Sequence, residues 1–369
     1  MVNPAYRVQS IELSQIRKIF EMGDENSINL GIGEPDFDVP ENIKIAMKSA
    51  IDNNDSHYTP NKGYLDLREE ISKKFKNENN IKTNPENIIV TSGASEGLYL
   101  CAQALFNKND EVIIPDPGFL SYESCVKLSE AQAIPLKCKM ENNFEIKAED
   151  VKEIINKNTK AIILNSPSNP TGAVMDKEDV KAIADLSTDY DFMIISDEIY
   201  EKIIYDKKHY SPGEFSDNVI TINGFSKTYA MTGLRIGYLT GNSEIIEELL
   251  KVHQYCVACA SSVSQRGAVE ALKGEQTTVN NMVKEFEKRR SLIVNSLIDM
   301  GHECVTPQGA FYAFPKIENS DIFVEKAAKS GVLTVPGIAF GENGKDFVRM
   351  SYANSYENIE KAMDILKTL

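Results

Sequence analysis

The sequence predicts an α/β protein whose central sheet is mostly parallel and covered by helices on both faces. Up to about residue 240, short runs rich in β-branched apolar residues alternate with amphipathic stretches of helical periodicity. This alternation is typical of parallel strands joined by crossover helices. The runs comprise residues 88–91, 112–114, 161–164, 193–195 and 219–222.

Each of these runs ends abruptly in polar, glycine or proline residues. The segments that follow the runs are 92–95, 115–118, 165–167, 196–198 and 223–227. In open α/β sheets, ligands bind just outside the carboxyl ends of the strands, so we expect a binding site at this edge. The alternative is that these segments are ordinary turns, because the same residue types end strands in any α/β protein.

The pattern of the sequence changes near residue 277. Apolar residues between Val279 and Ile298 recur at helical spacing, and Gly301 follows at the usual position just past a helix end. Short strands and helices then alternate to residue 369, which indicates a smaller α+β domain. We expect a large domain over residues 36–275 and a small domain that combines residues 1–35 with residues 276–369.

The composition is that of an ordinary globular protein, with 42% hydrophobic and 26% charged residues among 369. The formal net charge of −15 would repel phosphate backbones, so we expect no nucleic-acid partner. The N-terminus shows no apolar signal core, and no apolar run is long enough to cross a membrane. These features predict a cytoplasmic protein without a membrane partner.

Six scattered cysteines are too few for a disulfide scaffold at this length. Cys256 and Cys259 form a lone C-x-x-C pair without a second pair or a nearby histidine couple. We therefore expect both to be small buried apolar residues, and we expect no metal; a metal or redox site is the less favoured alternative.

Lys227 is the most informative candidate for chemistry. It follows the fifth apolar run on a turn of small residues, and Arg235 comes eight residues later. Burial lowers the pKa of a lysine and frees its amine to attack a carbonyl, as in a Schiff base. A guanidinium suits a phosphate dianion, so the pair suggests pyridoxal phosphate as the cofactor. The alternative is a solvated surface lysine, which is the usual case.

With these motifs, the chain resembles a class I/II aminotransferase of fold type I, near the aspartate aminotransferase branch. The resemblance extends from the segment Leu30-Gly31-Ile32-Gly33-Glu34-Pro35-Asp36-Phe37 through the lysine motif of residues 224–237 to Arg349. It implies a fold type I transferase that depends on pyridoxal 5'-phosphate, with residues 36–275 as the cofactor-binding domain. It also implies a homodimer.

The implied reaction moves the amino group of an L-amino acid to a 2-oxo acid such as 2-oxoglutarate. The mechanism would be ping-pong, with the cofactor alternating between pyridoxal and pyridoxamine forms. Aspartate is the first choice of donor, while aromatic, alanine and diaminopimelate-type donors remain open. Further alternatives are a lyase or synthase using the same cofactor, a transcriptional regulator, and a lysine aldolase without cofactor. Only about 30 residues precede the segment at Leu30, which disfavours a regulator with a DNA-binding module.

The resemblance assigns the central catalytic roles to three residues. Lys227 would bind the cofactor and later carry the proton that leaves the substrate α-carbon. Asp197 would pair with the pyridine nitrogen and keep it protonated. Tyr200, together with Asn169 of Asn169-Pro170-Thr171-Gly172, would hydrogen-bond the ring hydroxylate. The alternative for Asp197 is a helix N-cap, because aspartate is favoured there.

The phosphate of the cofactor would lie at the turn Gly93-Ala94-Ser95, where small residues let backbone N–H groups approach an anion. Ser226 and Arg235 would complete this cradle. Gly224 stands where many relatives have a serine, so one phosphate contact is expected to be missing or replaced by water.

The remaining assignments concern the ring, the substrate and the second subunit. Phe119 would stack on the pyridine, and its alternative is a core aromatic. Arg349 would clamp the substrate α-carboxylate with help from Gly33 and Asn169, and its alternative is an exposed salt bridge. Tyr58 would reach the phosphate of the neighbouring subunit.

Overall fold

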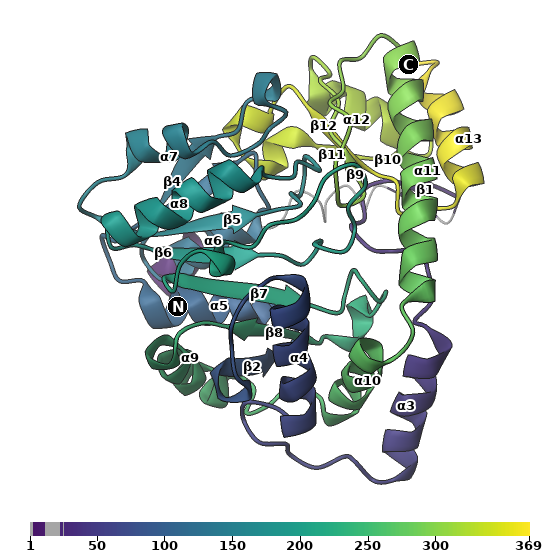
Figure 1. Ribbon diagram of the computed structural model, residues 1–369. Coiled ribbons are helices and arrows are strands. Elements are labelled where there is room, and N and C mark those ends of the chain that lie inside the picture. Colours follow the sequence, from purple (N-terminus) through teal and green to yellow (C-terminus); the bar gives the residue numbers. More distant parts are fainter. Residues whose placement is uncertain (1–2, 12–22, 25) are drawn as a thin grey trace.

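The computed structural model describes residues 3–11, 23–24 and 26–369 and contains a seven-stranded main sheet (Figure 1). The strand order is β2-β8-β7-β6-β5-β3-β4. The strands are β2 (Ile88–Thr91), β3 (Glu111–Asp116), β4 (Gln132–Lys137), β5 (Thr159–Asn165), β6 (Met193–Asp197), β7 (Val219–Gly224) and β8 (Gly237–Thr240). Only β8 runs in the direction opposite to the other six strands, so the mostly parallel α/β sheet is confirmed.

All five apolar runs form strands, and two further strands, β4 and β8, were not predicted. Strand β4 lies at the edge of the sheet, has exposed residues and contains Pro135, so it lacks a continuous apolar signature. Strand β8 is only four residues long and begins at Gly237, inside the lysine motif, so its β-propensity is weak.

Helices cover both faces of the main sheet. On one face α5 (Ala94–Leu105), α6 (Ser121–Leu128) and α9 (Ser243–Cys256) share an apolar cluster with the strands. On the other face lie α7 (Ala148–Ile154) and α8 (Lys177–Asp189), and α3 (Glu41–Asp52), α4 (Leu65–Glu78) and α10 (Ser262–Lys273) pack beside β2 and β8. Because successive strand residues point to opposite faces, Ile162 and Ile163 enter different clusters.

A long helix, α11 (Thr277–Asp299), runs along one side of the molecule (Figure 1). Gly301 follows it with a φ of +87°, as expected for the residue that ends a helix. The predicted long helix is therefore confirmed. Around its C-terminal half lie helices α12 (Ser320–Lys329) and α13 (Tyr356–Leu366) with strands β9 (Tyr312–Ala313), β10 (Val332–Leu333), β11 (Val335–Pro336) and β12 (Val348–Ser351).

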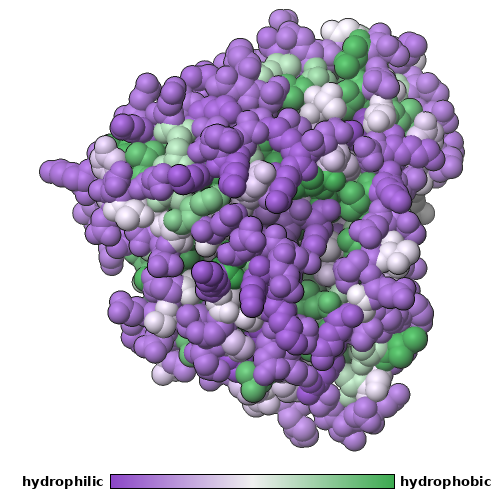
Figure 2. Space-filling model, in the orientation of Figure 1, coloured by the Kyte–Doolittle hydropathy of each residue, from purple (hydrophilic) through white to green (hydrophobic). Residues whose placement is uncertain are grey.

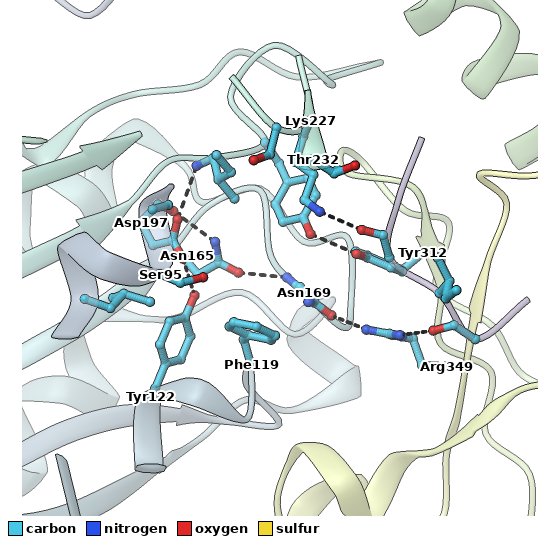
Figure 3. Close-up of a pocket in the computed structure, with 18 of the residues that line it drawn as sticks. Ser95, Phe119, Tyr122, Asn165, Asn169, Asp197, Lys227, Thr232, Tyr312 and Arg349 are labelled. Atoms are coloured by element: carbon cyan, nitrogen blue, oxygen red, sulfur yellow. Dashed lines mark hydrogen bonds between the residues drawn. The ribbon is translucent and has the colours of Figure 1, made fainter. Parts of the chain in front are cut away.

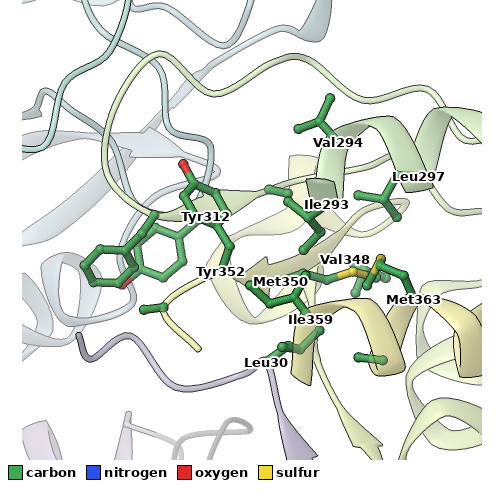
Figure 4. Packing of buried hydrophobic residues seen from close by; sticks show 14 of the residues in the cluster. Leu30, Ile293, Val294, Leu297, Tyr312, Val348, Met350, Tyr352, Ile359 and Met363 are labelled. Carbon is green, nitrogen blue, oxygen red and sulfur yellow. The ribbon is translucent and has the colours of Figure 1, made fainter. Parts of the chain in front are cut away.

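These C-terminal elements enclose their own apolar cluster, drawn in Figure 4. Leu30 belongs to it, next to strand β1 (Ile28–Asn29), which pairs with β10. The N-terminal helix α1 (Tyr6–Gln9) has no buried residue. The expected domain division at residues 35/36 and 275/276 stays a prediction, and part of its N-terminal segment lies outside the described residues.

The face of the molecule in Figure 2 is mostly hydrophilic, with apolar residues in small scattered groups. Among the described helices, none combines the length and the apolar character needed to cross a bilayer.

Candidate active site

The carboxyl ends of strands β2, β3, β5, β6 and β7 meet at one edge of the sheet, where a cavity of about 260 Å³ opens toward Tyr312 and Arg349 (Figure 3). Most of the residues predicted for the site line this cavity. They are Gly33, Ala94, Ser95, Phe119, Asn169, Asp197, Tyr200, Ser226, Lys227, Arg235 and Arg349. Residues more than 300 positions apart in sequence thus share one cavity, as Gly33 and Arg349 do.

Two predicted residues are not among those that line the cavity. Gly93 precedes α5 with a φ of +82°, directly beside the Arg235 guanidinium. Tyr58 is 89% exposed, and the structure does not bring it into the site of its own chain. An exposed position agrees with a role in another subunit, which stays a prediction.

The Lys227 amine lies between the sheet edge and the N-terminal segment. Its Nζ donates a hydrogen bond to the Gly33 carbonyl oxygen at 2.6 Å. Burial lowers the pKa of Lys227 to about 8, and the positive charges of Arg235 and Arg349 act in the same direction. An amine with that pKa is partly unprotonated near neutral pH, as a nucleophile for a carbonyl must be.

Asp197 is the last residue of β6 and is almost fully buried. Its Oδ2 accepts a hydrogen bond from the Tyr122 hydroxyl at 2.9 Å, and its Oδ1 accepts one from the Ile199 N–H at 3.3 Å. Burial raises the pKa of Asp197 to about 6, against the lowering effect of the Tyr122 hydrogen bond. A turn rather than a helix follows Asp197, so the alternative of a helix N-cap does not apply.

Tyr200 and Asn169 lie on the side of the cavity that faces Arg349. The Tyr200 hydroxyl shares a hydrogen bond of 2.8 Å with the Tyr312 hydroxyl. Burial raises the pKa of Tyr200 well above its ordinary value, so it stays a neutral donor. The Asn169 Oδ1 accepts a hydrogen bond from Arg349 Nη1 at 3.0 Å, which joins β12 to the loop after β5.

Arg349 is buried in β12, and its guanidinium lies between two aromatic rings. Its Cζ is 4.6 Å from the Tyr312 ring centre and 4.7 Å from that of Phe340. Arg349 Nη2 also donates to the Gly31 carbonyl oxygen, whereas the buried Nε has no hydrogen-bond partner in the described part of the chain. A buried guanidinium with a free donor is not an exposed salt bridge, and it is suited to receive a carboxylate.

A cradle for an anion exists at the N-terminus of α5. A Cβ atom on Gly93 would lie 2.6 Å from Arg235 Nη2, and one on Gly237 would lie 2.7 Å from the Ala94 nitrogen. Glycine therefore lets the backbone N–H groups and the guanidinium approach one point, where the helix dipole also favours negative charge. Ser226 lines the same cavity.

Gly224 has a steric explanation in this structure. It is the last residue of β7 and pairs with Gly237 of β8. A Cβ atom there would lie 3.0 Å from Ile199 Cδ1 and 3.2 Å from the Gly237 Cα, so a side chain at 224 would be crowded. Whether the phosphate loses a contact stays a prediction.

The sequence patterns missed several residues that line the cavity. Those with polar side chains are Tyr122, Asn165, Thr232 and Tyr312. Asn165 ends an apolar run, and its position at the strand end was a signal that could have been used. Tyr122 and Tyr312 carry no such signal, because a tyrosine in a helix or a short strand is usually a packing residue.

Next to Asp197 in sequence begins a buried polar group that contains Glu198, Glu201, His209, Lys74 and the neutral Asn79. Lys74 pairs with Glu201, and His209 Nε2 lies 3.0 Å from Glu198 Oε2. Although the carboxylates and His209 are close enough to hold a cation, the Lys74 ammonium already compensates Glu201. Burial raises the pKa of Glu201, yet Lys74 and His209 bring it down to about 2.

The expectation that Cys256 and Cys259 are buried is wrong for Cys256 and only partly right for Cys259. Cys256 is exposed at the C-terminal end of α9, and Cys259 is half-buried; both are free thiols. The last buried residue of α9 is His253, and Cys256 follows it at the helix end outside the core.

The fold and the cavity together define a class of enzyme. A buried amine of lowered pKa, a buried carboxylate and an anion cradle surround one cavity, and a second guanidinium stands at its far side. These groups fit an aromatic aldehyde that carries a phosphate and a ring nitrogen, which is the chemistry of pyridoxal 5'-phosphate.

Comparison with known proteins identifies the family. Residues 25–366 match the family model of aminotransferase class I and II. The chain is 51% identical to a probable aspartate aminotransferase of Methanocaldococcus jannaschii over 98% of both chains. It is 40% identical to aromatic-amino-acid aminotransferase 2 of Thermococcus litoralis, covering 97% of this chain and 96% of that one.

Among solved structures, aspartate aminotransferase from Thermus thermophilus with maleate superposes with a TM-score of 0.95 at 34% identity, and the match covers 100% of each chain. The chain therefore belongs to the class I and II aminotransferase family. It is a transaminase of fold type I, and its cofactor is pyridoxal 5'-phosphate.

Proposed function

We propose that this transaminase uses L-aspartate as its physiological donor and 2-oxoglutarate as acceptor, with the residues of the cavity in the roles given below. The observation that carries the proposal is that one cavity holds the Lys227 amine, the Asp197 carboxylate and the buried Arg349 guanidinium. The choice of aspartate is supported by the 51% identical relative named for that reaction.

Bound pyridoxal phosphate supplies a protonated ring that accepts the negative charge left on the substrate α-carbon. Asp197 would hold that protonated nitrogen, and the hydrogen bond from the Tyr122 hydroxyl favours the ionised form of the Asp197 carboxylate. Phe119 covers the ring. Gly93, Ala94, Ser95, Ser226 and Arg235 bind the phosphate.

Lys227 moves the proton of the reaction. Its Nζ takes the proton from the substrate α-carbon, a task that suits an amine with a pKa lowered to about 8. Tyr200 and Asn169 donate hydrogen bonds to the ring oxygen. Arg349 orients the α-carboxylate, with the backbone of Gly33 at its other side.

An aromatic donor is the second candidate. The cavity walls include the apolar side chains of Ile32, Leu98 and Phe119. The cationic residues that line it within the described residues are Lys227, Arg235 and Arg349, and each already has a role. A side-chain carboxylate thus has no assigned partner there, and the relative from Thermococcus litoralis is named for aromatic amino acids.

A panel of donors with 2-oxoglutarate distinguishes these candidates. The visible absorbance of the cofactor should change to that of its amino form with L-aspartate faster than with aromatic amino acids, L-alanine or diaminopimelate. If aspartate leaves the spectrum unchanged while another donor converts it, the choice of substrate is wrong. Borohydride reduction followed by peptide mapping should find the pyridoxyl group on Lys227, and a label elsewhere would refute its role.

The proposal includes a cytoplasmic homodimer in which Tyr58 reaches the phosphate of the neighbouring subunit. Tyr58 lies on a loop that Asn61 ties to the α9–α10 connection through a hydrogen bond of 2.7 Å to the Ala258 carbonyl oxygen. Tyr255, in the last turn of α9 just before that connection, is 88% exposed, so each of the two joined segments carries an exposed tyrosine. Large exposed aromatics of this kind are typical of interfaces.

Mixed dimers test the shared site. Tyr58→Ala and Lys227→Ala subunits should each be poorly active alone. A hybrid of the two contains one site with both residues intact, so mixing after mild dissociation should recover activity. No recovery in a proven hybrid would show that Tyr58 acts within its own subunit or has no role.

A further inference from the structure

Asp116 is a buried carboxylate outside the cavity that makes no ion pair within the described residues. It is the last residue of β3, three positions before Phe119, and it is 6% exposed. Both of its carboxylate oxygens accept hydrogen bonds from one residue, Asn343, in the C-terminal part of the chain. Asn343 donates its backbone N–H to Oδ1 at 3.1 Å and its side-chain Nδ2–H to Oδ2 at 2.8 Å.

The backbone around Asp116 is built for this approach. Gly341 has a φ of +129°, and a Cβ atom on it would collide with the Asp116 carboxylate. One residue past Pro117, the Gly118 N–H donates to the Phe340 carbonyl oxygen at 2.8 Å. The turn that carries Phe119 is therefore joined at two points to the 3-10 turns η5 (Gly337–Phe340) and η6 (Glu342–Gly344).

The 3-10 turn η5 also contacts Arg349. The Phe340 ring lies 4.7 Å from the Arg349 Cζ and forms one of the two aromatic faces around the guanidinium. Strand β11 leads directly into η5 and pairs with β12, where Val335 lies opposite Arg349. A shift of η5 and η6 would therefore move the Phe340 ring away from the Arg349 guanidinium. It would also displace strand β12, which carries Arg349.

Apolar packing also joins these segments, because Val335 and Phe340 share an apolar cluster with Ile113. A second cavity of about 380 Å³ lies between β3, β4 and η5, and Phe119 and Phe340 both line it. The apolar cluster does not fill this space, and the hydrogen bonds of Asp116 lie at its border. A buried carboxylate without a cation is costly, and burial raises the pKa of Asp116.

We propose that Asp116 is a positioning residue whose two hydrogen bonds to Asn343 hold the Arg349 guanidinium in register with Phe119 for the substrate carboxylate. We call this pair the Asp116–Asn343 latch. The proposal rests on the proposed role of Arg349 as the carboxylate clamp. The latch aligns the substrate and does not touch it, so breaking it affects binding of the carboxylate more than the chemical step.

A swap of the two side chains provides the sharpest test. Asp116→Asn sets an amide donor against the donors of Asn343, and Asn343→Asp sets two carboxylates against each other. In the double variant, Asn at 116 accepts from the backbone N–H of 343 and donates to Asp at 343, so both hydrogen bonds return with the same total charge. Holoenzyme of all three variants is compared with the unaltered protein.

Each single variant should raise the KM for the amino-acid donor about tenfold or more, with kcat within about threefold, and the double variant should restore KM. The dissociation constant of maleate, a dicarboxylate without an amino group, should follow the same order in a spectral titration. A donor amine without an α-carboxylate should react equally with all of them. A residue that only supports the fold would lower thermal stability and kcat together, for donors with and without an α-carboxylate alike.

Unchanged maleate binding in a folded, cofactor-loaded Asp116→Asn variant would overturn the latch. So would a double variant as weak as the single ones. If Asp116→Asn does not fold, Asn343→Ala keeps the backbone N–H and should give a smaller loss of maleate binding, and an unchanged constant there would refute the proposal. Failure of the unaltered enzyme to use any donor refutes the proposed function instead, and so the two failures are distinguishable.

Discussion

The Tyr122 hydroxyl donates a hydrogen bond of 2.9 Å to Oδ2 of Asp197, and both groups are buried. Burial raises the pKa of Tyr122 well above its ordinary value, so the donor keeps its proton throughout the working range. The same bond lowers the pKa of Asp197, which burial alone would raise further. Tyr122 therefore helps to keep the carboxylate ionised.

Replacing Tyr122 by Phe should shift the acid limb of the kcat/KM profile to higher pH. Without the hydrogen bond the ionised form of Asp197 is less favoured, its pKa rises, and the carboxylate is lost at a higher pH. We expect a shift of about one pH unit. Tyr190→Phe, at an exposed tyrosine, is the matched control. An acid limb that does not move would contradict the role of Tyr122.

Asp197→Asn should stabilise the cofactor-free protein at pH 7. The pKa of Asp197 is raised from 3.8 to about 6, so the folded protein binds this proton more tightly than the unfolded chain. The contribution to stability is complete below pH 3.8 and is lost as the pH rises through 6. The difference between a pKa of 3.8 and one of about 6 corresponds to roughly 3 kcal/mol.

Urea unfolding of cofactor-free protein at pH 4, 5, 6 and 7 measures this effect. The unaltered protein should lose stability across that range relative to Asp197→Asn, whereas Asp52→Asn on an exposed helix end should follow the unaltered protein. Parallel curves for all three would show that Asp197 titrates normally.

Lys227→Ala should abolish transamination while the protein still folds. The nucleophile and the group that moves the proton disappear together, so kcat should fall by at least about 10³-fold. Lys361→Ala at an exposed position controls for loss of a charge. Borohydride should no longer attach the cofactor to the 227 peptide, and normal turnover would refute the assignment.

Arg349→Leu should raise the KM for the donor strongly, by about 10²-fold, because a bidentate contact to the carboxylate is lost. Arg349→Lys should recover only part of this loss, since an ammonium keeps the charge but not the planar fork. Steady-state kinetics in which the donor and the acceptor concentrations are varied separately checks both half-reactions. An unaltered KM in the Arg349→Leu variant would show that another residue binds the α-carboxylate.

Lys74→Met should destabilise the fold by about 3–5 kcal/mol, because Glu201 would be left buried without its cation. Lys74 and Glu201 are both buried, and the lowered pKa of Glu201 makes the pair stabilising above pH 4.5. That stability is lost as the pH falls toward 2, so the difference between variant and unaltered protein should shrink in acid. The neighbouring exposed lysine Lys73, which pairs with Glu70, offers the control Lys73→Met, which should leave the free energy of unfolding nearly unchanged.

Local patterns predicted a large part of the fold because they report burial. The β-branched runs around Ile163 and Ile194 are buried on both faces of a parallel sheet, and such strands read as continuous apolar segments. Strand β4 escaped notice because an edge strand does not need that signature. Cys256 was wrongly predicted to be buried, because burial changes within one turn at a helix end and residue type alone does not show this.

The strand ends, the lysine motif and the long helix follow from the sequence alone, since each depends on residues that are neighbours along the chain. Three contacts depend on the folded chain: Tyr122 donates to Asp197, Arg349 bonds to Asn169 across 180 positions, and Asn343 donates to Asp116. These contacts join segments whose separation leaves no trace in local periodicity. The first arises from the packing of α6 against the main sheet, and the other two arise from the packing of the C-terminal elements against its carboxyl edge. A local sequence pattern cannot encode such contacts.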